Sequence, residues 1–236
     1  WGGGLTFTMV PGLSITADYY NIKIKDRVVV TENLQGAAVV SLLQSKGCNN
    51  ITSARFFVNG IDTRTKGVEV VASYRIPDMG VGKMTLNAGY NYNKTSITDR
   101  AVLTTLPGLT LFGRQESLRM TEGQPRDKIN VGLDWDIGPV GLTARTNRYG
   151  KVLVPGVDAA RDQWLSAKWV TDLEVRVKPM DAVELAVGAN NLFDVYPDQV
   201  RAGLVNGQNY GLNGYFIPYS QFSPFGFNGR FLYGRV

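Results

Sequence analysis

Residues 183–197 read VELAVGANNLFDVYP and join an alternating strand to a loop that begins with Asn-Asn-Leu-Phe-Asp. Successive side chains of a β-strand point to opposite faces of the sheet. One face of this strand would carry Val183, Leu185, Val187 and Ala189, and the other would carry Ala182, Glu184, Ala186, Gly188 and Asn190. An apolar face opposite a mixed face is typical of a strand that separates lipid from a watery lumen. Phe193 and Tyr196 follow where an interfacial aromatic belt is expected.

Three further segments, 84–92, 128–137 and 165–177, show the same alternation. The predicted outward-facing side chains are Met84, Leu86, Ala88, Tyr90 and Tyr92, then Ile129, Val131, Leu133, Trp135 and Ile137, then Leu165, Ala167, Trp169, Thr171, Leu173, Val175 and Val177. Charges of both signs fall on the opposite, inner face: Lys128, Asp134, Asp136, Lys168, Asp172, Glu174 and Arg176. Because unpaired buried charge is costly, this face is expected to line a wet lumen, with most charges paired across neighbouring strands.

The connections between predicted strands alternate between short and long. The short ones, each with Pro and most with Gly, are 10–13, 77–82, 137–141 and 178–182, and the long ones are 31–53, 96–125, 150–163 and 195–225. Such alternation is typical of an up-and-down membrane barrel with periplasmic turns and extracellular loops. A soluble antiparallel sandwich is the alternative, but it has short connections on both sides. Residues 34–46 are the one predicted helix, inside a long loop.

Several stretches resemble a known family. They are DYYNIKIKDRV at 18–28, ARFFVNG at 54–60, DTRTKGVEVVASY at 62–74, VELAVGANNLFDVYP at 183–197 and GFNGRFLYGRV at 226–236. In this order they resemble the barrel strands of TonB-dependent outer-membrane receptors, over nearly the whole chain. The resemblance implies an all-β fold, an antiparallel up-and-down transmembrane β-barrel, to which the pattern of residues 34–46 adds one short loop helix.

The resemblance also implies how much of a receptor is present. Family barrels have about 22 strands. The chain supplies about nine, an odd number where single-chain bacterial barrels use an even one. No segment resembles the N-terminal plug domain that family members hold inside the barrel. We therefore expect residues 1–236 to be the C-terminal part of the barrel of a longer receptor.

The function that the resemblance implies is uptake of a scarce nutrient, such as an iron chelate, at the bacterial outer membrane. Its expected partners are the lipid bilayer, the remainder of the barrel, the small nutrient ligand, and TonB, which would supply energy through the plug. A non-transporting structural or adhesive outer-membrane barrel is the alternative function. A plug domain encoded upstream of Trp1 would favour transport over this alternative.

Composition excludes several other functions. The chain has 236 residues with no His and one Cys, so an intramolecular disulfide and most zinc, haem and serine-triad chemistry are excluded. We expect neither an enzyme nor a bound cofactor. The net charge is +5, yet Lys and Arg are scattered among Asp and Glu without a basic run, which argues against a nucleic-acid partner.

Candidate ligand-binding residues follow from the lumen and the last long loop. Lumen-facing cations would favour an anionic ligand if they converge, and residues 195–225 are rich in Gly, Asn, Tyr and Phe, which can stack on a ligand and hydrogen-bond to it. The alternative is a loop that uses its aromatic residues for its own packing. The candidates are Arg145, Tyr149, Lys168, Tyr210 and Tyr215.

Overall fold

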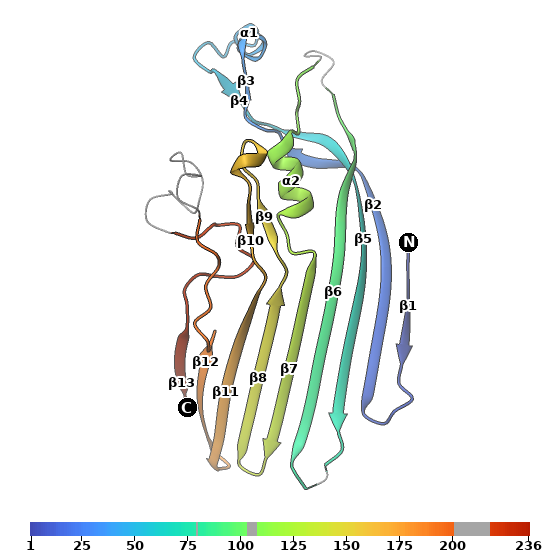
Figure 1. Ribbon diagram of the computed structural model, residues 1–236, viewed down its shortest axis with the longest axis vertical. Helices are drawn as coiled ribbons and strands as arrows, with labels where there is room; N and C mark the ends of the chain where they lie inside the picture. Colours follow the sequence, from blue (N-terminus) through green and yellow to red (C-terminus); the bar gives the residue numbers. More distant parts are fainter. Residues whose placement is uncertain (79, 103–107, 201–217) are drawn as a thin grey trace.

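A computed structural model describes residues 1–78, 80–102, 108–200 and 218–236, and its main feature is one broad antiparallel sheet (Figure 1). In spatial order its nine strands are β1 (Gly2–Phe7), β2 (Leu13–Val30), β5 (Phe57–Ile76), β6 (Lys83–Arg100), β7 (Asp127–Ile137), β8 (Val140–Tyr149), β11 (Lys168–Met180), β12 (Val183–Asn190) and β13 (Phe231–Arg235). Neighbours in this order pair antiparallel, so the sheet is the predicted up-and-down meander. Among the described strands, β1 and β13 each pair on one side only, so the sheet is part of a barrel wall.

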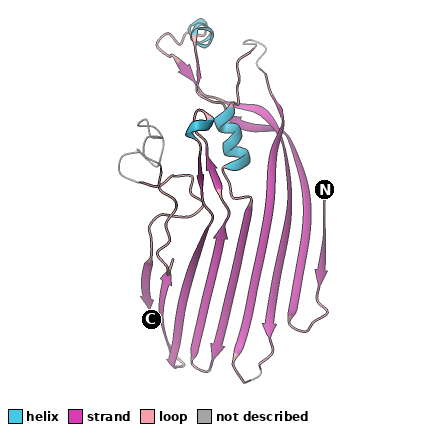
Figure 2. Ribbon diagram, in the orientation of Figure 1, coloured by secondary structure: helices cyan, strands magenta, loops and turns pink. Residues whose placement is uncertain are grey.

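All four predicted tight turns are confirmed, and they lie together at one end of the sheet (Figure 1). The two shortest have two residues each: Gly138 and Pro139 connect β7 to β8, and Asp181 and Ala182 connect β11 to β12. The opposite end carries the long connections and the short helices, which Figure 2 shows in cyan. We call these the turn end and the loop end of the sheet.

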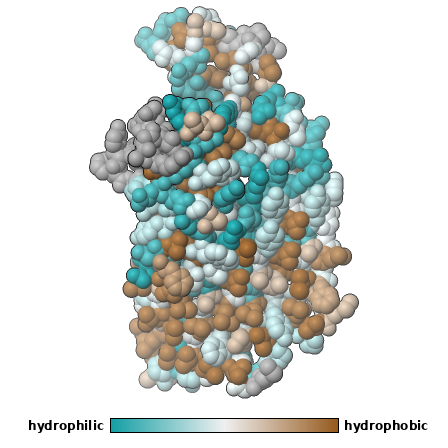
Figure 3. All heavy atoms as spheres, in the orientation of Figure 1, coloured by the Kyte–Doolittle hydropathy of each residue, from teal (hydrophilic) through white to brown (hydrophobic). Residues whose placement is uncertain are grey.

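The strand register confirms that apolar side chains share one face, which we call the outer face. Leu86, Leu133 and Ala144 form one cross-strand row, and Met84, Trp135 and Leu142 form another. Large apolar side chains on this face are exposed, such as Trp169 at 47% and Val175 at 40%. They are not packed in a compact interior. On the face shown in Figure 3, apolar residues gather over the turn end and polar residues over the loop end.

In the part of the chain that the structure describes, buried apolar side chains form three small clusters near the loop end. The clusters are Val152, Val154 and Leu165, then Val29, Ile61 and Phe112, then Leu34, Val39 and Leu111. They fasten loops to the upper parts of strands, whereas the sheet below them is held by its ladders of backbone hydrogen bonds. This distribution is expected of a wall with lipid on one side and a lumen on the other.

The predicted strand 165–177 was wrong at its loop end, both in where the strand begins and in the position of Leu165. Leu165 was placed on the outer face of a continuous strand, but it is 3% exposed and belongs to β10 (Gln163–Leu165), which pairs with β9 (Val152–Val154). The carboxylate of Asp198 accepts hydrogen bonds from the amide and hydroxyl of Ser166, at 2.5 and 2.9 Å. These bonds hold the chain outside the ladder at Ser166 and Ala167, so β11 begins only at Lys168.

The predicted loop helix is confirmed as α1 (Ala37–Ser45), which follows the short strand β3 (Leu34–Gln35) that pairs with β4 (Ser53–Ala54). A second helix, α2 (Arg114–Glu122), was missed, as was the single turn η1 (Ala159–Arg161). Strongly polar residues dominate α2, so its sequence lacks an apolar stripe. Within the described residues, neither helix has the length and apolar character needed to cross a bilayer.

Placing Leu133→Arg near the middle of the outer face should destabilise the barrel that contains this chain by about 2–4 kcal/mol, because a cation would face hydrocarbon. Thr85→Arg is the control, since Thr85 lies opposite Asp134 on the inner face and should change stability by less than about 1 kcal/mol. Urea unfolding in lipid vesicles measures both values. Equal losses would contradict the assignment of faces.

Candidate functional site

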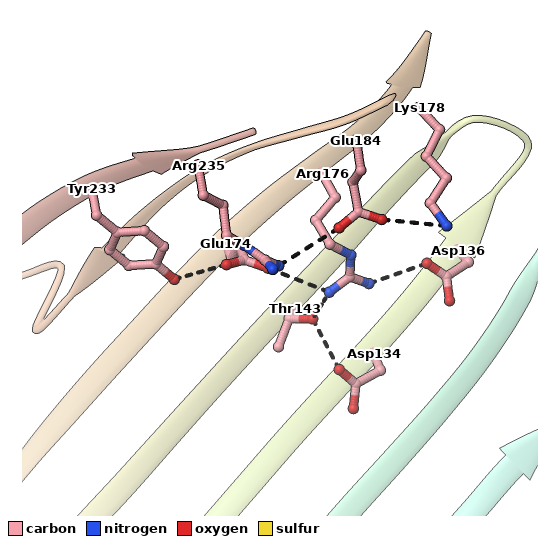
Figure 4. Close-up of polar contacts among 9 residues, drawn as sticks. All are labelled: Asp134, Asp136, Thr143, Glu174, Arg176, Lys178, Glu184, Tyr233 and Arg235. Atoms are coloured by element: carbon pink, nitrogen blue, oxygen red, sulfur yellow. Dashed lines mark hydrogen bonds and ion pairs between the residues drawn. The ribbon is translucent and has the colours of Figure 1, made fainter. Parts of the chain in front are cut away.

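Polar residues of five adjacent strands form a connected cluster on the inner face, which Figure 4 shows and which we call the inner-face network. Its members are Asp134 and Asp136 on β7, Thr143 on β8, Glu174, Arg176 and Lys178 on β11, Glu184 on β12, and Tyr233 and Arg235 on β13. Cross-strand register brings them together, because Asp134 lies opposite Thr143 and Thr143 lies opposite Glu174.

Glu174 and Arg176 are the centre of this network. Glu174 accepts hydrogen bonds from the Tyr233 hydroxyl and the Arg235 guanidinium, both at 2.9 Å. Arg176 donates to the Thr143 hydroxyl at 2.8 Å and to the Asp136 carboxylate at 3.2 Å, and lies 3.5 Å from Glu174. The side chains of Glu174 and Arg176 are 15% and 22% exposed. Charge-assisted bonds this sheltered stabilise the wall more than exposed surface pairs do.

Two glycines allow these side chains to reach over an intervening strand. Gly188 of β12 lies between Glu174 and Tyr233, and a Cβ built there would be 2.3 Å from the Tyr233 ring. Gly141 of β8 is crossed in the same way by the Arg176 guanidinium, 2.9 Å from the position of such a Cβ. A side chain at either glycine would therefore displace its partner, so these positions need glycine for close approach.

Four inner-face cations were predicted to pair with carboxylates of neighbouring strands: Lys128, Arg145, Lys168 and Arg176. Among the described residues only Arg176 does so, with Asp136, and it also contacts Glu174 of its own strand. Lys168 instead pairs with Asp198 of the following loop, at 2.8 Å. Lys128 lies over the ring of Tyr149, 5.1 Å from its centroid. These partners come from a loop and an aromatic ring, which the alternation of charges along strands does not indicate.

Arg145 is the predicted site residue that remains open to the lumen. It lies on the inner face of β8, opposite Gly132 and Asp172. In the part of the chain that the structure describes, its guanidinium has no hydrogen bond or ion pair. The Asp172 carboxylate accepts the Asn191 amide at 2.8 Å. Arg145 thus lines a cavity of about 320 Å³ together with Asp172, Glu174 and Arg176.

The structure brings Tyr149 and Lys168 together and places Arg145 on the same face. Tyr149 lies directly opposite Lys168, four residues along β8 from Arg145, a separation of about 13 Å. The Tyr149 ring also stacks on Phe225, with centroids 5.5 Å apart. Both Tyr149 and Lys168 are therefore occupied by contacts within the protein. Tyr210 and Tyr215 lie outside the described residues.

Aromatic residues of the last loop pack on one another where the loop is described. Tyr219 stacks between Tyr196 and Phe227, at centroid distances of 5.6 and 5.9 Å. Tyr196 therefore contacts this loop, while Phe193 is 68% exposed. Arg119 of α2 lies 5.1 Å from the centroid of the Phe222 ring. These contacts support the self-packing interpretation for residues 218–227.

Further ion pairs fasten the loops near the loop end. Arg114, at the start of α2, bonds to both carboxylate oxygens of Asp162, at 3.1 and 2.6 Å. Burial raises the pKa of Asp162, but hydrogen bonds from Arg114 and the Gly156 amide outweigh it and leave the pKa below its usual value. Among the described residues, no group of three or more His, Cys, Asp and Glu is placed to hold a metal ion.

An open antiparallel meander with an apolar outer face and a charged inner face defines the chain as part of an outer-membrane β-barrel. Residues 1–192 match the family model described as TonB dependent receptor-like, beta-barrel. The chain belongs to this family, whose members are outer-membrane transporters and not enzymes. No curated protein matches it.

Solved structures agree with this fold. The chain is similar to the FrpB iron transporter from Neisseria meningitidis (17% identity, TM-score 0.57), covering 83% of this chain and 27% of that one. It is similar to the outer membrane transporter YddB from Escherichia coli (10%, TM-score 0.54; 84% and 29%). A third is the copper transporter OprC (17%, TM-score 0.53; 90% and 28%). The chain thus spans roughly a quarter of the length of these structures.

Glu174→Gln should destabilise the barrel by about 1–3 kcal/mol, because Arg176 and Arg235 would lose a sheltered anionic partner. Glu184→Gln is the matched control. Its carboxylate is 34% exposed and contacts Lys178 and Arg235 at 3.3 and 3.7 Å, so its loss should cost less than about 1 kcal/mol. Urea unfolding in vesicles compares the two, and the opposite ranking would refute the central role of Glu174.

Burial raises the pKa of Asp198, but hydrogen bonds from Lys168 and Ser166 outweigh it, so the pKa lies below its usual 3.8. The stabilisation from ionised Asp198 should therefore be complete above pH 3.8 and be lost as the pH falls through the lower folded value. Hydrogen exchange of the Ser166 amide, corrected for its intrinsic rate, measures this loss. Asp198→Asn should remove the pH dependence, and loss of protection already at pH near 6 would contradict the assignment.

Proposed function

We propose that the chain is the C-terminal part of the barrel of a receptor that takes up a scarce nutrient, such as an iron chelate, across the outer membrane. The observation that carries this proposal is the inner face, where charged side chains line one side of a membrane wall whose other side is apolar. A polar lumen of this kind admits water-soluble solutes. Energy for transport would come from TonB, acting through a plug domain inside the completed barrel.

Arg145 is the strongest candidate for a ligand contact in this wall. An unpaired guanidinium that lines a cavity can bind carboxylate or phosphate in a bidentate manner. The neighbouring cation Arg176 is already bonded to Asp136 and Thr143, so its charge is largely compensated. The ligand that Arg145 favours is therefore anionic. Tyr149 and Lys168 would border the same path nearer the loop end, as would Tyr210 and Tyr215 if the last loop reaches the ligand.

Uptake is tested in cells that lack the receptor gene and in cells that carry the full-length gene, both grown on limiting metal chelates. Cellular iron and copper are measured by mass spectrometry. The proposal expects higher metal content with the receptor, and only when TonB is functional. Unchanged metal content in both strains would favour the structural or adhesive barrel instead.

Arg145→Gln should weaken binding of an anionic chelate to the full-length receptor about ten-fold, the effect of losing one charge-assisted contact. Lys46→Gln removes the same charge from the exposed end of α1 and should leave affinity unchanged. Titration of the purified receptor with the chelate whose uptake is observed measures both. Equal affinities for Arg145→Gln and the unmodified receptor would remove Arg145 from the binding site.

A further inference from the structure

The outer face of β2, β5 and β6 changes character in ordered rows from the turn end to the loop end. The first row that spans all three strands above the turns is Leu13, Tyr74 and Leu86, and the next rows contain Ile15, Ala72 and Ala88, then Ala17, Val70 and Tyr90. The fourth row is Tyr19, Val68 and Tyr92, which has the aromatic character of a membrane interface.

Directly above this aromatic row the outer face becomes basic. Lys66 lies opposite Lys94 in the strand register, and Arg64 lies opposite Lys23. All four side chains are exposed. We call these four residues the basic patch. Like charges directly opposite each other on one face destabilise a sheet, so two such pairs side by side require compensation from elsewhere.

The described residues do not supply that compensation. None of the four cations forms an ion pair, and the one hydrogen bond from their side chains joins Arg64 to the neutral Asn21 at 2.8 Å. Asp127, the carboxylate opposite Tyr92, is bonded to Arg148. Asp62, two residues beyond Arg64, accepts the Asp26 amide at 3.0 Å. Arg148, another cation of the outer face, is thus paired, whereas the four cations of the basic patch are not.

The height of the patch places it at the membrane surface. Lys66 is ten residues along β5 from Ile76 at the turn end. At about 3.4 Å per residue and a tilt of about 40°, it stands about 26 Å above the turns. The apolar band of a membrane barrel is about 25 Å tall. Lys66 and Lys94 thus lie at the level of lipid headgroups on the loop side.

The patch also has the shape of a binding site. Tyr19, Val68 and Tyr92 form the lower wall of a depression of about 500 Å³, and the basic side chains Arg64, Lys66 and Lys94 line its upper part with Ser96 and Thr98. A ligand that fits it has an apolar part below and an anionic part above. Two nearby carboxylates lie on the inner face and not beside the patch. In the strand register Glu69 lies opposite Asp18 of β2 and Asn91 of β6, which both face inward.

We propose that the basic patch binds the phosphate-bearing headgroup of a lipid in the outer leaflet, with its acyl chains lying against the aromatic row. Phosphate oxygens would accept hydrogen bonds from Lys66, Lys94 and Arg64 and neutralise their mutual repulsion. The inference depends on the barrel's position in the membrane. It does not depend on which nutrient is transported, so the two proposals fail separately.

The test uses the full-length receptor purified in a neutral detergent, with binding of diphosphoryl lipid A followed by native mass spectrometry. Lys66→Gln/Lys94→Gln should weaken binding about thirty-fold, because each lysine at an anionic lipid surface contributes about five-fold. Lys66→Arg/Lys94→Arg keeps both charges and should keep binding. Without lipid, the glutamine variant should unfold at the same temperature as the unmodified receptor or higher, since it removes a repulsive pair.

Lys46→Gln/Lys83→Gln is the charge-matched control, with two exposed lysines outside the patch, and should bind lipid A as the unmodified receptor does. Equal binding by the Lys66→Gln/Lys94→Gln variant and this control would overturn the proposal. Displacement of lipid A by equimolar inorganic phosphate would overturn the assignment to a lipid. A lower unfolding temperature of the glutamine variant without lipid would show that the lysines stabilise the protein itself.

Discussion

Backbone N–H and C=O groups that face hydrocarbon find no hydrogen-bond partner there, so a membrane wall of strands must satisfy them within the protein. Within the described residues, the nine-stranded sheet does this through seven internal strands, each paired on both sides, while β1 and β13 are paired on one side only. A sheet with two open edges is unstable in lipid, and these strands are stable in the bilayer only as part of a larger closed wall. Closure of the barrel, more than any apolar core, is what the fold depends on.

That constraint explains why side chains on the inner face reach so far. Without a packed core, the strands are held together by their ladders and by polar side chains that cross them. Gly141 and Gly188 leave room for Arg176 and Tyr233 to pass over a neighbouring strand. Glu174 consequently receives donors from β13, two strands away from its own. The inner-face network thus links β7 to β13 across the strands between them.

The period-two pattern was sufficient to predict the wall. Side-chain alternation in segments such as 128–137 fixes both the strand and its faces, because lipid and water impose opposite requirements on successive residues. The loop end was not predictable in the same way. Leu165 continues the alternation of β11 in the sequence, yet the hydrogen bonds from Ser166 to Asp198 interrupt the strand. The partner is 32 residues away, and no local sequence pattern predicts it.

In the candidate site, too, the sequence predicted which face a side chain occupies but not which distant residue it contacts. Arg145 and Lys168 were predicted to face the lumen, and the register places them, together with Tyr149, on the inner face. Their partners did not follow from the alternation, because Lys168 pairs with a loop carboxylate, while Tyr149 is covered by Phe225 from the last loop. Tyr233 and Arg235 were missed as members of the network, although the alternation of Phe231, Tyr233 and Arg235 placed them on one face. What a residue contacts across several strands depends on glycine spacing in the strands between, which only the register reveals.

Cations of this wall differ in whether a carboxylate of the same chain pairs with them, and this difference separates structural from functional cations. Arg176 on the inner face is compensated by carboxylates of its own chain, because lumen residues are fixed by neighbouring strands. Lys66 and Lys94 on the outer face oppose each other and have no carboxylate within the described ion pairs. The anionic surface of the membrane attracts cations at that height. An uncompensated basic patch is therefore stable where lipid phosphates surround it, because they supply the negative charge that the sheet lacks.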